Sequence, residues 1–153
     1  MNIEELSQRL KDVLWSDELL KVLPEVGWND GGCRSLMRAF QLWLGSENTV
    51  PYQIVKTIDQ HHSEHALVRV GAWFLDGDGI STHLQLLLRW HIEEGFENVI
   101  IRPFKPDLEP AHTDGELPYY ISEAHIHELI RMLDRNINKK NLLSHLRSYK
   151  GWE

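Results

Sequence analysis

Residues 65–79, HALVRVGAWFLDGDG, are the strongest local constraint on how this chain folds. Residues 66–70 and 73–75 are rich in β-branched and aromatic side chains, which favour strands, and Gly71 between them favours a turn. The Asp-Gly-Asp-Gly run at 76–79 ends the second strand. We therefore predict a tight antiparallel hairpin with apolar side chains on both faces.

The hairpin brings one histidine and one aspartate together in either of two registers. If the chain turns at Val70-Gly71, His65 lies directly opposite Asp76; if it turns at Gly71-Ala72, the two are diagonal neighbours on one face. A slip of one residue separates them onto opposite faces. Because a buried His and Asp are costly unless they satisfy each other, we predict that His65 contacts Asp76. The alternative is that His65 is a loop residue and Asp76 only begins the turn.

The chain has one cysteine, Cys33, which follows two glycines and begins a predicted helix. The helix is predicted over 33–44, because Leu36, Phe40 and Leu44 form an apolar stripe. At a helix N-terminus, unpaired backbone N–H groups and the helix dipole lower the pKa of a thiol and can stabilise an oxyanion. A single cysteine excludes an internal disulfide and a four-cysteine zinc site. Cys33 is therefore either a reactive thiol or a small core residue.

The other predicted elements complete an α+β fold within a single domain, residues 1–153. Asn2, Ser81 and Ser122 are candidate helix N-caps. The helix after Ser81 is expected to run through Leu84, Leu87, Leu88 and Ile92. The core is expected at about 25–104, with a C-terminal helical extension at about 119–150. The remaining helices are predicted at about 3–15, 17–23, 122–136 and 139–149, and the remaining strands at about 50–58 and 98–104.

Charge and hydropathy limit the classes of partner. The formal net charge is -7 and the basic residues are scattered, so we expect no nucleic-acid partner. No apolar run resembles a signal peptide or is long enough to cross a membrane, so we expect a cytoplasmic protein without a membrane partner. The pattern does not indicate an oligomeric state.

Three segments, GGCRSLMRAFQLWL, HALVRV and WFLDGDG, together resemble the core of the papain-like thiol hydrolases, including NlpC/P60 and transglutaminase-like proteins. The resemblance covers about residues 27–80. These families place the Cys at a helix N-terminus, the His at the start of a following strand, and the Asp or Asn on the next strand. The resemblance implies a papain-like fold in which the Cys-bearing helix packs on a small antiparallel sheet.

The resemblance also implies a catalytic triad and its chemistry. Cys33 would be the nucleophile, His65 the general base and acid, and Asp76 the orienting carboxylate, with Asp78 as an alternative third member. The expected reaction is attack on an amide through an acyl-thioester, as in a peptidase, deamidase or transglutaminase. A protein or peptide substrate is expected, and no cofactor.

The residues before Cys33, which would bind an oxyanion or substrate, match the papain pattern less well. Papain has a glutamine several residues before its cysteine, whereas the position six before Cys33 is Gly27. Asn29 is the nearest amide side chain, and Gly32 lets a substrate backbone approach closely. Trp28 is a candidate for the cleft wall or the core.

Two other functions remain open. His61, His62 and His65 with Asp76 and Asp78 could bind a divalent metal, although their spacing matches no recognised metal motif, so no metal ligand is assigned.

The chain could also be a catalytically silent papain-like binding protein, an accessory or effector protein that holds a protein or small molecule in its groove. The loop at 105–118 is long for a compact domain, so it is either a flap over the site or a partner-binding segment, and Tyr119-Tyr120 at its end would be a suitable anchor.

Overall fold

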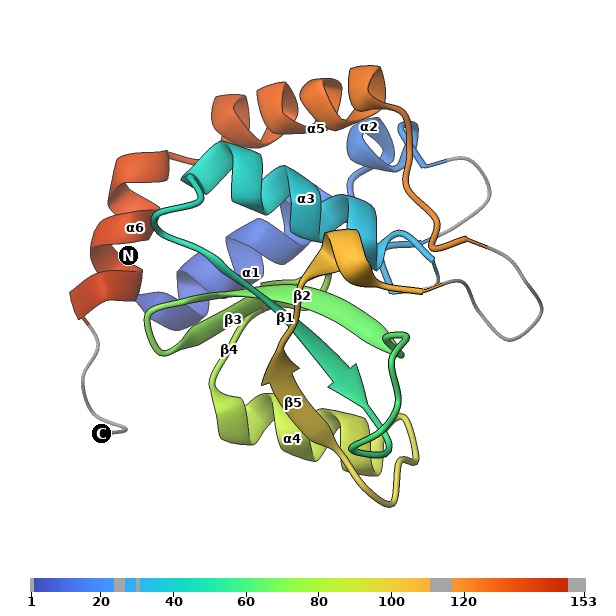
Figure 1. Ribbon diagram of the computed structural model, residues 1–153. Helices are drawn as coiled ribbons and strands as arrows, with labels where there is room; N and C mark the ends of the chain where they lie inside the picture. Colours follow the sequence, from blue (N-terminus) through green and yellow to red (C-terminus); the bar gives the residue numbers. More distant parts are fainter. Residues whose placement is uncertain (1, 24–26, 30, 111–116, 149–153) are drawn as a thin grey trace.

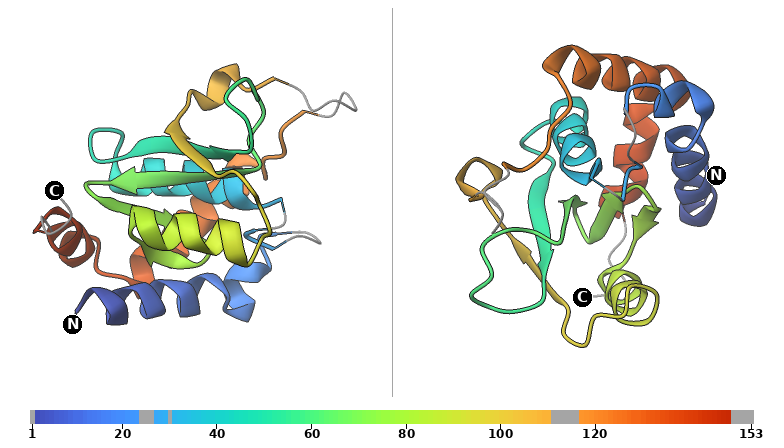
Figure 2. Two further views of the ribbon diagram at one scale, coloured as in Figure 1. Left: turned by 90° about the horizontal axis from the view of Figure 1, so that it is seen from below. Right: turned by 90° about the vertical axis from the view of Figure 1, so that its right-hand side faces the viewer.

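The computed structural model describes residues 2–23, 27–29, 31–110 and 117–148. Over these residues the chain is α+β, with six α-helices and one five-stranded antiparallel sheet (Figure 1). Helix α4 covers one face of the sheet, while α1, α3, α5 and α6 lie on the other side (Figure 2). The helices are α1 (Ile3–Leu14), α2 (Asp17–Leu20), α3 (Cys33–Leu44), α4 (His83–Ile92), α5 (Glu123–Asn136) and α6 (Lys139–Ser148).

Side-chain caps mark the start of helices α1, α4 and α5, for which the sequence predicted a cap residue. Asn2 accepts a hydrogen bond from the Glu5 N–H at the start of α1, and Ser122 accepts one from the His125 N–H at the start of α5, as predicted. The predicted cap of α4, Ser81, is wrong by one residue. Thr82 forms a capping box with Gln85 instead, because Ser81 still belongs to a strand.

The sheet has the strand order β4-β3-β2-β1-β5, so β2 lies at its centre. The short strand β4 was not predicted, because the Asp-Gly-Asp-Gly run was expected only to end the preceding strand. It is instead a turn that pairs Asp76 with Gly79 and leads into β4. The strands are β1 (Val50–Val55), β2 (His65–Val70), β3 (Trp73–Asp76), β4 (Gly79–Ser81) and β5 (Ile100–Pro103).

The β2–β3 hairpin has the second of the two predicted registers. Val70 pairs with Trp73 and Val68 with Leu75, so the turn lies at Gly71-Ala72. Gly71 has a φ of 61°, a left-handed backbone conformation that residues other than glycine rarely adopt. In this register His65 and Asp76 are diagonal neighbours on the same face.

The alternation along this hairpin separates two apolar cores. Ala66, Val68 and Val70 of β2 point into the main core, which lies between the sheet and helices α1, α3, α5 and α6. Leu67 points to the other face, into a smaller core that includes Trp90 of α4. His65 and Asp76 are therefore on the α4 face of the hairpin.

Helix α4 buries a different face from the one expected. Leu86 and Trp90 are buried against the sheet, whereas three residues of the predicted apolar set, Leu84, Leu88 and Ile92, are exposed. Apolar residues occur on all sides of this helix, so periodicity alone does not determine its orientation.

The two C-terminal helices, which were predicted as an extension outside the core, contribute side chains to the main core. α5 packs on α3 through Ile126, Leu129 and Leu133, and α6 adds Leu142 and Leu146. No helix in the described ranges is both long enough and apolar enough to span a membrane.

Candidate functional site

Cys33 is the first residue of α3, as predicted, and its side chain is 4% exposed. The N-cap position is Gly32, which provides no side-chain cap, so no side chain competes for the N–H groups of the first turn. The backbone N–H of Ala66, at the start of β2, lies close enough to the Cys33 sulfur to lower the pKa of the thiol. Helix α3 and strand β2 thus meet at the thiol.

His65 and Asp76 form the contact that the hairpin pattern predicted. Nε2 of His65 lies 2.9 Å from Oδ2 of Asp76, and the two residues are 1% and 3% exposed. The ring of Trp90 on α4 packs against the imidazole, with the ring centroids 4.9 Å apart. The imidazole is therefore held between a carboxylate and an aromatic ring.

The His65 ring, whose other nitrogen is Nδ1, also interacts with the Cys33 thiol. Among the described residues Nδ1 has no partner with strict hydrogen-bond geometry, yet the ring and the Cys33 thiol interact closely enough to shift each other's pKa. The two groups thus interact without an aligned hydrogen bond, and catalytic pairs are often poorly aligned before substrate binds. The structure thus brings Cys33, His65 and Asp76 together in one chain of contacts.

These contacts favour a thiolate paired with an imidazolium. Burial by itself raises the pKa of Cys33, but the hydrogen bond and charge of His65, the charge of Arg34 and the Ala66 N–H together lower it. Burial likewise lowers the pKa of His65, but Asp76 and Cys33 raise it to about 9. Both shifts favour a protonated His65 beside a Cys33 thiolate, and the thiolate is the nucleophilic form of cysteine.

Asp76 is held by more groups than the sequence suggested. Nη2 of Arg89 on α4 donates to Oδ2 at 2.6 Å, and the N–H of Asp78 donates to Oδ1 at 2.9 Å. Burial raises the pKa of Asp76, but the hydrogen bond and charge of His65, the charge of Arg89 and the Asp78 N–H lower it. Asp76 is therefore an ionised carboxylate with several donors.

Asp78, the alternative third member, makes other contacts. Its Oδ2 lies 3.3 Å from Nε of Arg89 and accepts the Asn29 side-chain amide at 3.3 Å. Asp76 is thus the carboxylate that bonds to His65, and Asp78 supports the turn and the arginine.

A buried ion pair lies directly after Cys33. Arg34 donates through Nε and Nη2 to the two carboxylate oxygens of Glu109, at 2.7 and 2.9 Å. Glu109 also accepts the Ser63 N–H at 2.6 Å, and Arg34 donates to the Ser63 carbonyl at 2.8 Å. The pair fixes part of the predicted 105–118 loop beside the thiol. Sequence reasoning missed it, because Arg34 and Glu109 are distant in the chain and no local pattern links them.

The chain that returns from this loop is also tied to the first turn of α3. The N–H of Ile121 donates to Oγ of Ser35 at 3.0 Å, and Tyr120 lies near enough to Cys33 and Glu109 for their charges to affect its pKa. Burial first, and then the charge of Glu109, raise that pKa. Residues 111–116 of the predicted loop lie outside the described part of the chain.

Each of the three residues expected on the oxyanion or substrate side donates one hydrogen bond to another protein group. Trp28 is fully buried and donates to the Leu14 carbonyl, so it is a core residue and does not line an open cleft. The Gly32 N–H donates to the carbonyl of Gly27, and the Asn29 amide donates to Asp78. The backbone N–H of Cys33 is among the first-turn donors of α3 that have no acceptor within the helix.

Gly77, in the turn after Asp76, packs against the chain that leads to Cys33. A Cβ at this position would lie 2.7 Å from Cβ of Trp28 and 3.0 Å from Oδ1 of Asn29. We expect Gly77→Ala to reduce the free energy of unfolding by about 1–3 kcal/mol, because a new methyl group must displace packed atoms. Urea denaturation measures this change. An unchanged stability would show that the turn does not rest on Trp28.

A metal site does not form from the residues proposed for it. Among the described residues, no three His, Cys, Asp or Glu side chains cluster so that they could hold a metal ion. His65 and Asp76 bond to each other, and His61 lies exposed in the preceding loop.

No protein-family model, no curated protein and no solved structure matches this chain.

Proposed function

We propose that this protein is a cysteine-dependent hydrolase or transferase with a papain-like fold that acts on an amide. The observation that carries the proposal is the contact chain from Cys33 through His65 to Asp76, with the cysteine at a helix N-terminus. The order of the three elements, helix then strand then strand, further supports a papain-like arrangement. Proteins or peptides are the proposed substrates.

The proposed reaction has two steps. The Cys33 thiolate attacks the amide carbonyl, the His65 imidazolium gives its proton to the leaving amine, and an acyl-thioester remains on the sulfur. His65, now neutral, then takes a proton from water or from an amine that attacks the thioester. Asp76 keeps the imidazole in the required orientation, and the Cys33 N–H stabilises the oxyanion.

An acylation experiment tests this proposal. The protein is incubated with an activated aryl ester of acetate and with a mixture of glutamine-containing peptides, with and without a primary amine. We expect mass spectrometry to show an acetyl group on Cys33 that turns over, and peptide products that reveal cleavage, deamidation or amine transfer. Cys33→Ala should give none of these. An acetyl group that forms elsewhere, or equally in Cys33→Ala, would contradict the proposal.

The burial of the site favours a second candidate function. Cys33, His65 and Asp76 are all at most 4% exposed, so an acyl donor reaches the sulfur only when neighbouring side chains shift. A catalytically silent binding protein needs no such movement. In that case Cys33 should alkylate slowly near neutral pH, and its rate should not depend on His65.

A further inference from the structure

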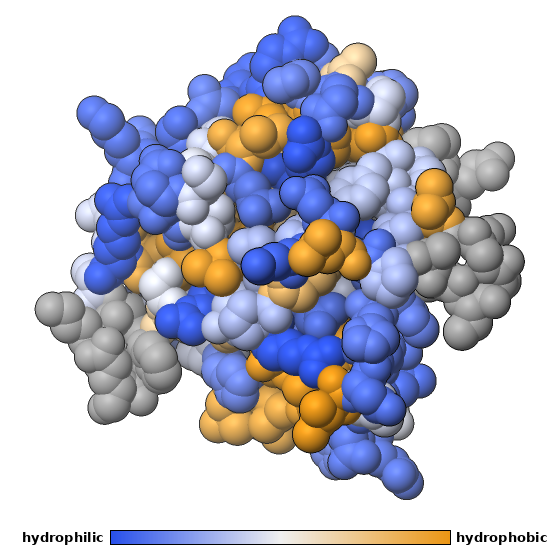
Figure 3. Space-filling view, viewed as in Figure 1, coloured by the Kyte–Doolittle hydropathy of each residue, from blue (hydrophilic) through white to orange (hydrophobic). Residues whose placement is uncertain are grey.

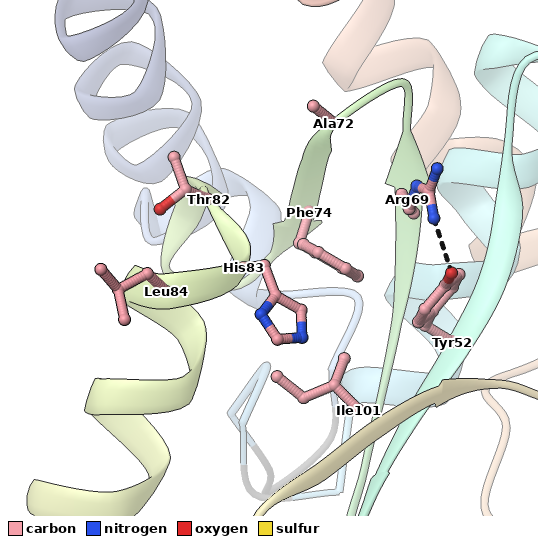
Figure 4. Close-up of a pocket in the computed structure, with 8 residues that line it drawn as sticks. All are labelled: Tyr52, Arg69, Ala72, Phe74, Thr82, His83, Leu84 and Ile101. Atoms are coloured by element: carbon pink, nitrogen blue, oxygen red, sulfur yellow. Dashed lines mark hydrogen bonds between the residues drawn. The ribbon is translucent and has the colours of Figure 1, made fainter. Parts of the chain in front are cut away.

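A cavity of about 490 Å³, which Cys33 does not line, lies on the α4 face of the sheet. Figure 4 shows its lining residues. It lies between the start of α4 and four strands, with the side chains of β1 and β2 on one wall and those of α4 on the other. Its size is within the range typical of small-molecule sites. The lining residues are Tyr52, Arg69, Ala72, Phe74, Thr82, His83, Leu84 and Ile101.

The walls of the cavity are mainly apolar and aromatic. Tyr52 and Phe74 pack edge to face with centroids 5.1 Å apart, and the ring of His83 lies 6.0 Å from that of Phe74. Leu84 forms the rim and is 61% exposed. Figure 3 shows apolar side chains in the lower part of the molecule, where Figure 1 places α4. A planar apolar group would contact side chains on both walls.

One cation is fixed in this wall. Arg69 on β2 donates through Nη1 to the Tyr52 hydroxyl at 2.7 Å and through Nε to the Gly71 carbonyl at 2.6 Å. Both acceptors are uncharged, and no acidic residue in the described ranges forms an ion pair with Arg69. In a chain with a net charge of -7, this half-buried arginine still pairs with none of the described carboxylates. Its guanidinium is positioned to pair with an anion.

We propose that this cavity is a binding site for a small aromatic carboxylate. The ring would lie among Phe74, Ile101 and Leu84, and the carboxylate would pair with Arg69. The apolar cavity suits the aromatic ring, and the positive charge of Arg69 complements the negative charge of the carboxylate. The site is separate from the thiol and does not depend on the function proposed for Cys33.

Titration with cinnamate, followed by backbone amide chemical shifts, tests the proposal. We expect binding to one site with a dissociation constant of about 1 mM or tighter, and shifts centred on the cavity residues. The neutral analogue cinnamamide should bind at least about tenfold more weakly, because it cannot pair with Arg69 as an anion. Arg69→Gln should weaken cinnamate to a similar extent, whereas Arg131→Gln, a remote and exposed change of the same charge, should not.

A second pair of variants tests the cavity without changing Arg69, because Arg69 also bonds to the Gly71 carbonyl in the hairpin turn. Leu84→Glu places a negative charge at the rim, in the first turn of α4, where an acidic residue does not disfavour the helix. It should weaken cinnamate severalfold, whereas Leu88→Glu, one turn further on and outside the cavity, should leave the affinity unchanged. Cinnamate that fails to bind, shifts that lie elsewhere, or equal affinity in Leu84→Glu and Leu88→Glu would overturn the proposal.

Discussion

Replacing His65 with Gln should slow the alkylation of Cys33 by iodoacetamide at neutral pH by at least about tenfold. Burial raises the pKa of this thiol, and the hydrogen bond and charge of His65 are the main effects that lower it. Glutamine keeps much of the volume but cannot carry the charge, so the thiolate fraction falls. Intact mass measured over time gives the rate for Cys33, the one cysteine in the chain.

The matched control is His61→Ala, which removes an exposed histidine four residues earlier and should leave the rate unchanged. Circular dichroism confirms that each variant is folded. Equal rates in His65→Gln and the unmodified protein would show that Cys33 is a buried core residue that His65 does not activate.

The same coupling predicts how activity depends on pH. The pKa of Cys33 is lowered, so the thiolate forms below the ordinary range of a thiol and the rate of acylation rises there. The pKa of His65 is raised to about 9, so the proton needed by the leaving amine is present at neutral pH and is lost as the pH rises past that value. A bell-shaped profile with an alkaline limb near 9 is expected, and its two limbs belong to the coupled pair.

Asp76→Ala should reduce the free energy of unfolding by about 3–5 kcal/mol at neutral pH. The carboxylate is buried and accepts from both His65 and Arg89, so its removal leaves His65 buried without its carboxylate and Arg89 paired with Asp78 alone. The control is Asp78→Ala, which removes a more exposed carboxylate and should cost no more than about 1 kcal/mol. Urea denaturation of both variants measures the difference.

The sign of the pH dependence follows from the lowered pKa of Asp76. Its stabilising contribution is fully present above its ordinary value of 3.8 and is lost as the pH falls through the lower value in the folded protein. The cost of Asp76→Ala should therefore shrink on acidification below that range. If Asp76→Ala reduces the free energy of unfolding by the same amount down to the lowest pH at which the protein folds, the conclusion that Asp76 is ionised in the folded protein is wrong.

Local patterns predicted the centre of the candidate site because its geometry is set by short-range rules. In a hairpin, residues on one face are determined by alternation once the turn is located, so His65 and Asp76 had to be neighbours in either register. Cys33 was predicted at a helix start because the two glycines interrupt the chain and the apolar stripe begins directly after them.

The residues around this centre could not be predicted in the same way. Arg89 reaches Asp76 only because α4 packs with Leu86 and Trp90 inward, and the apolar residues on all sides of that helix leave its orientation open. The Arg34–Glu109 pair joins two segments 75 residues apart, a contact that only the folded chain creates. These contacts determine how Cys33, His65 and Asp76 are supported and covered, and no local motif encodes them.

The pH titration of thiolate absorbance, taken as the difference between the unmodified protein and Cys33→Ala, tests the central claim most directly. An activated thiol coupled to His65 predicts a midpoint below the ordinary value of 9.0, and a midpoint that moves upward in His65→Gln. A midpoint at or above 9.0 in the unmodified protein, the value that burial alone would produce, would contradict the claim that Cys33, His65 and Asp76 form a reactive thiol site.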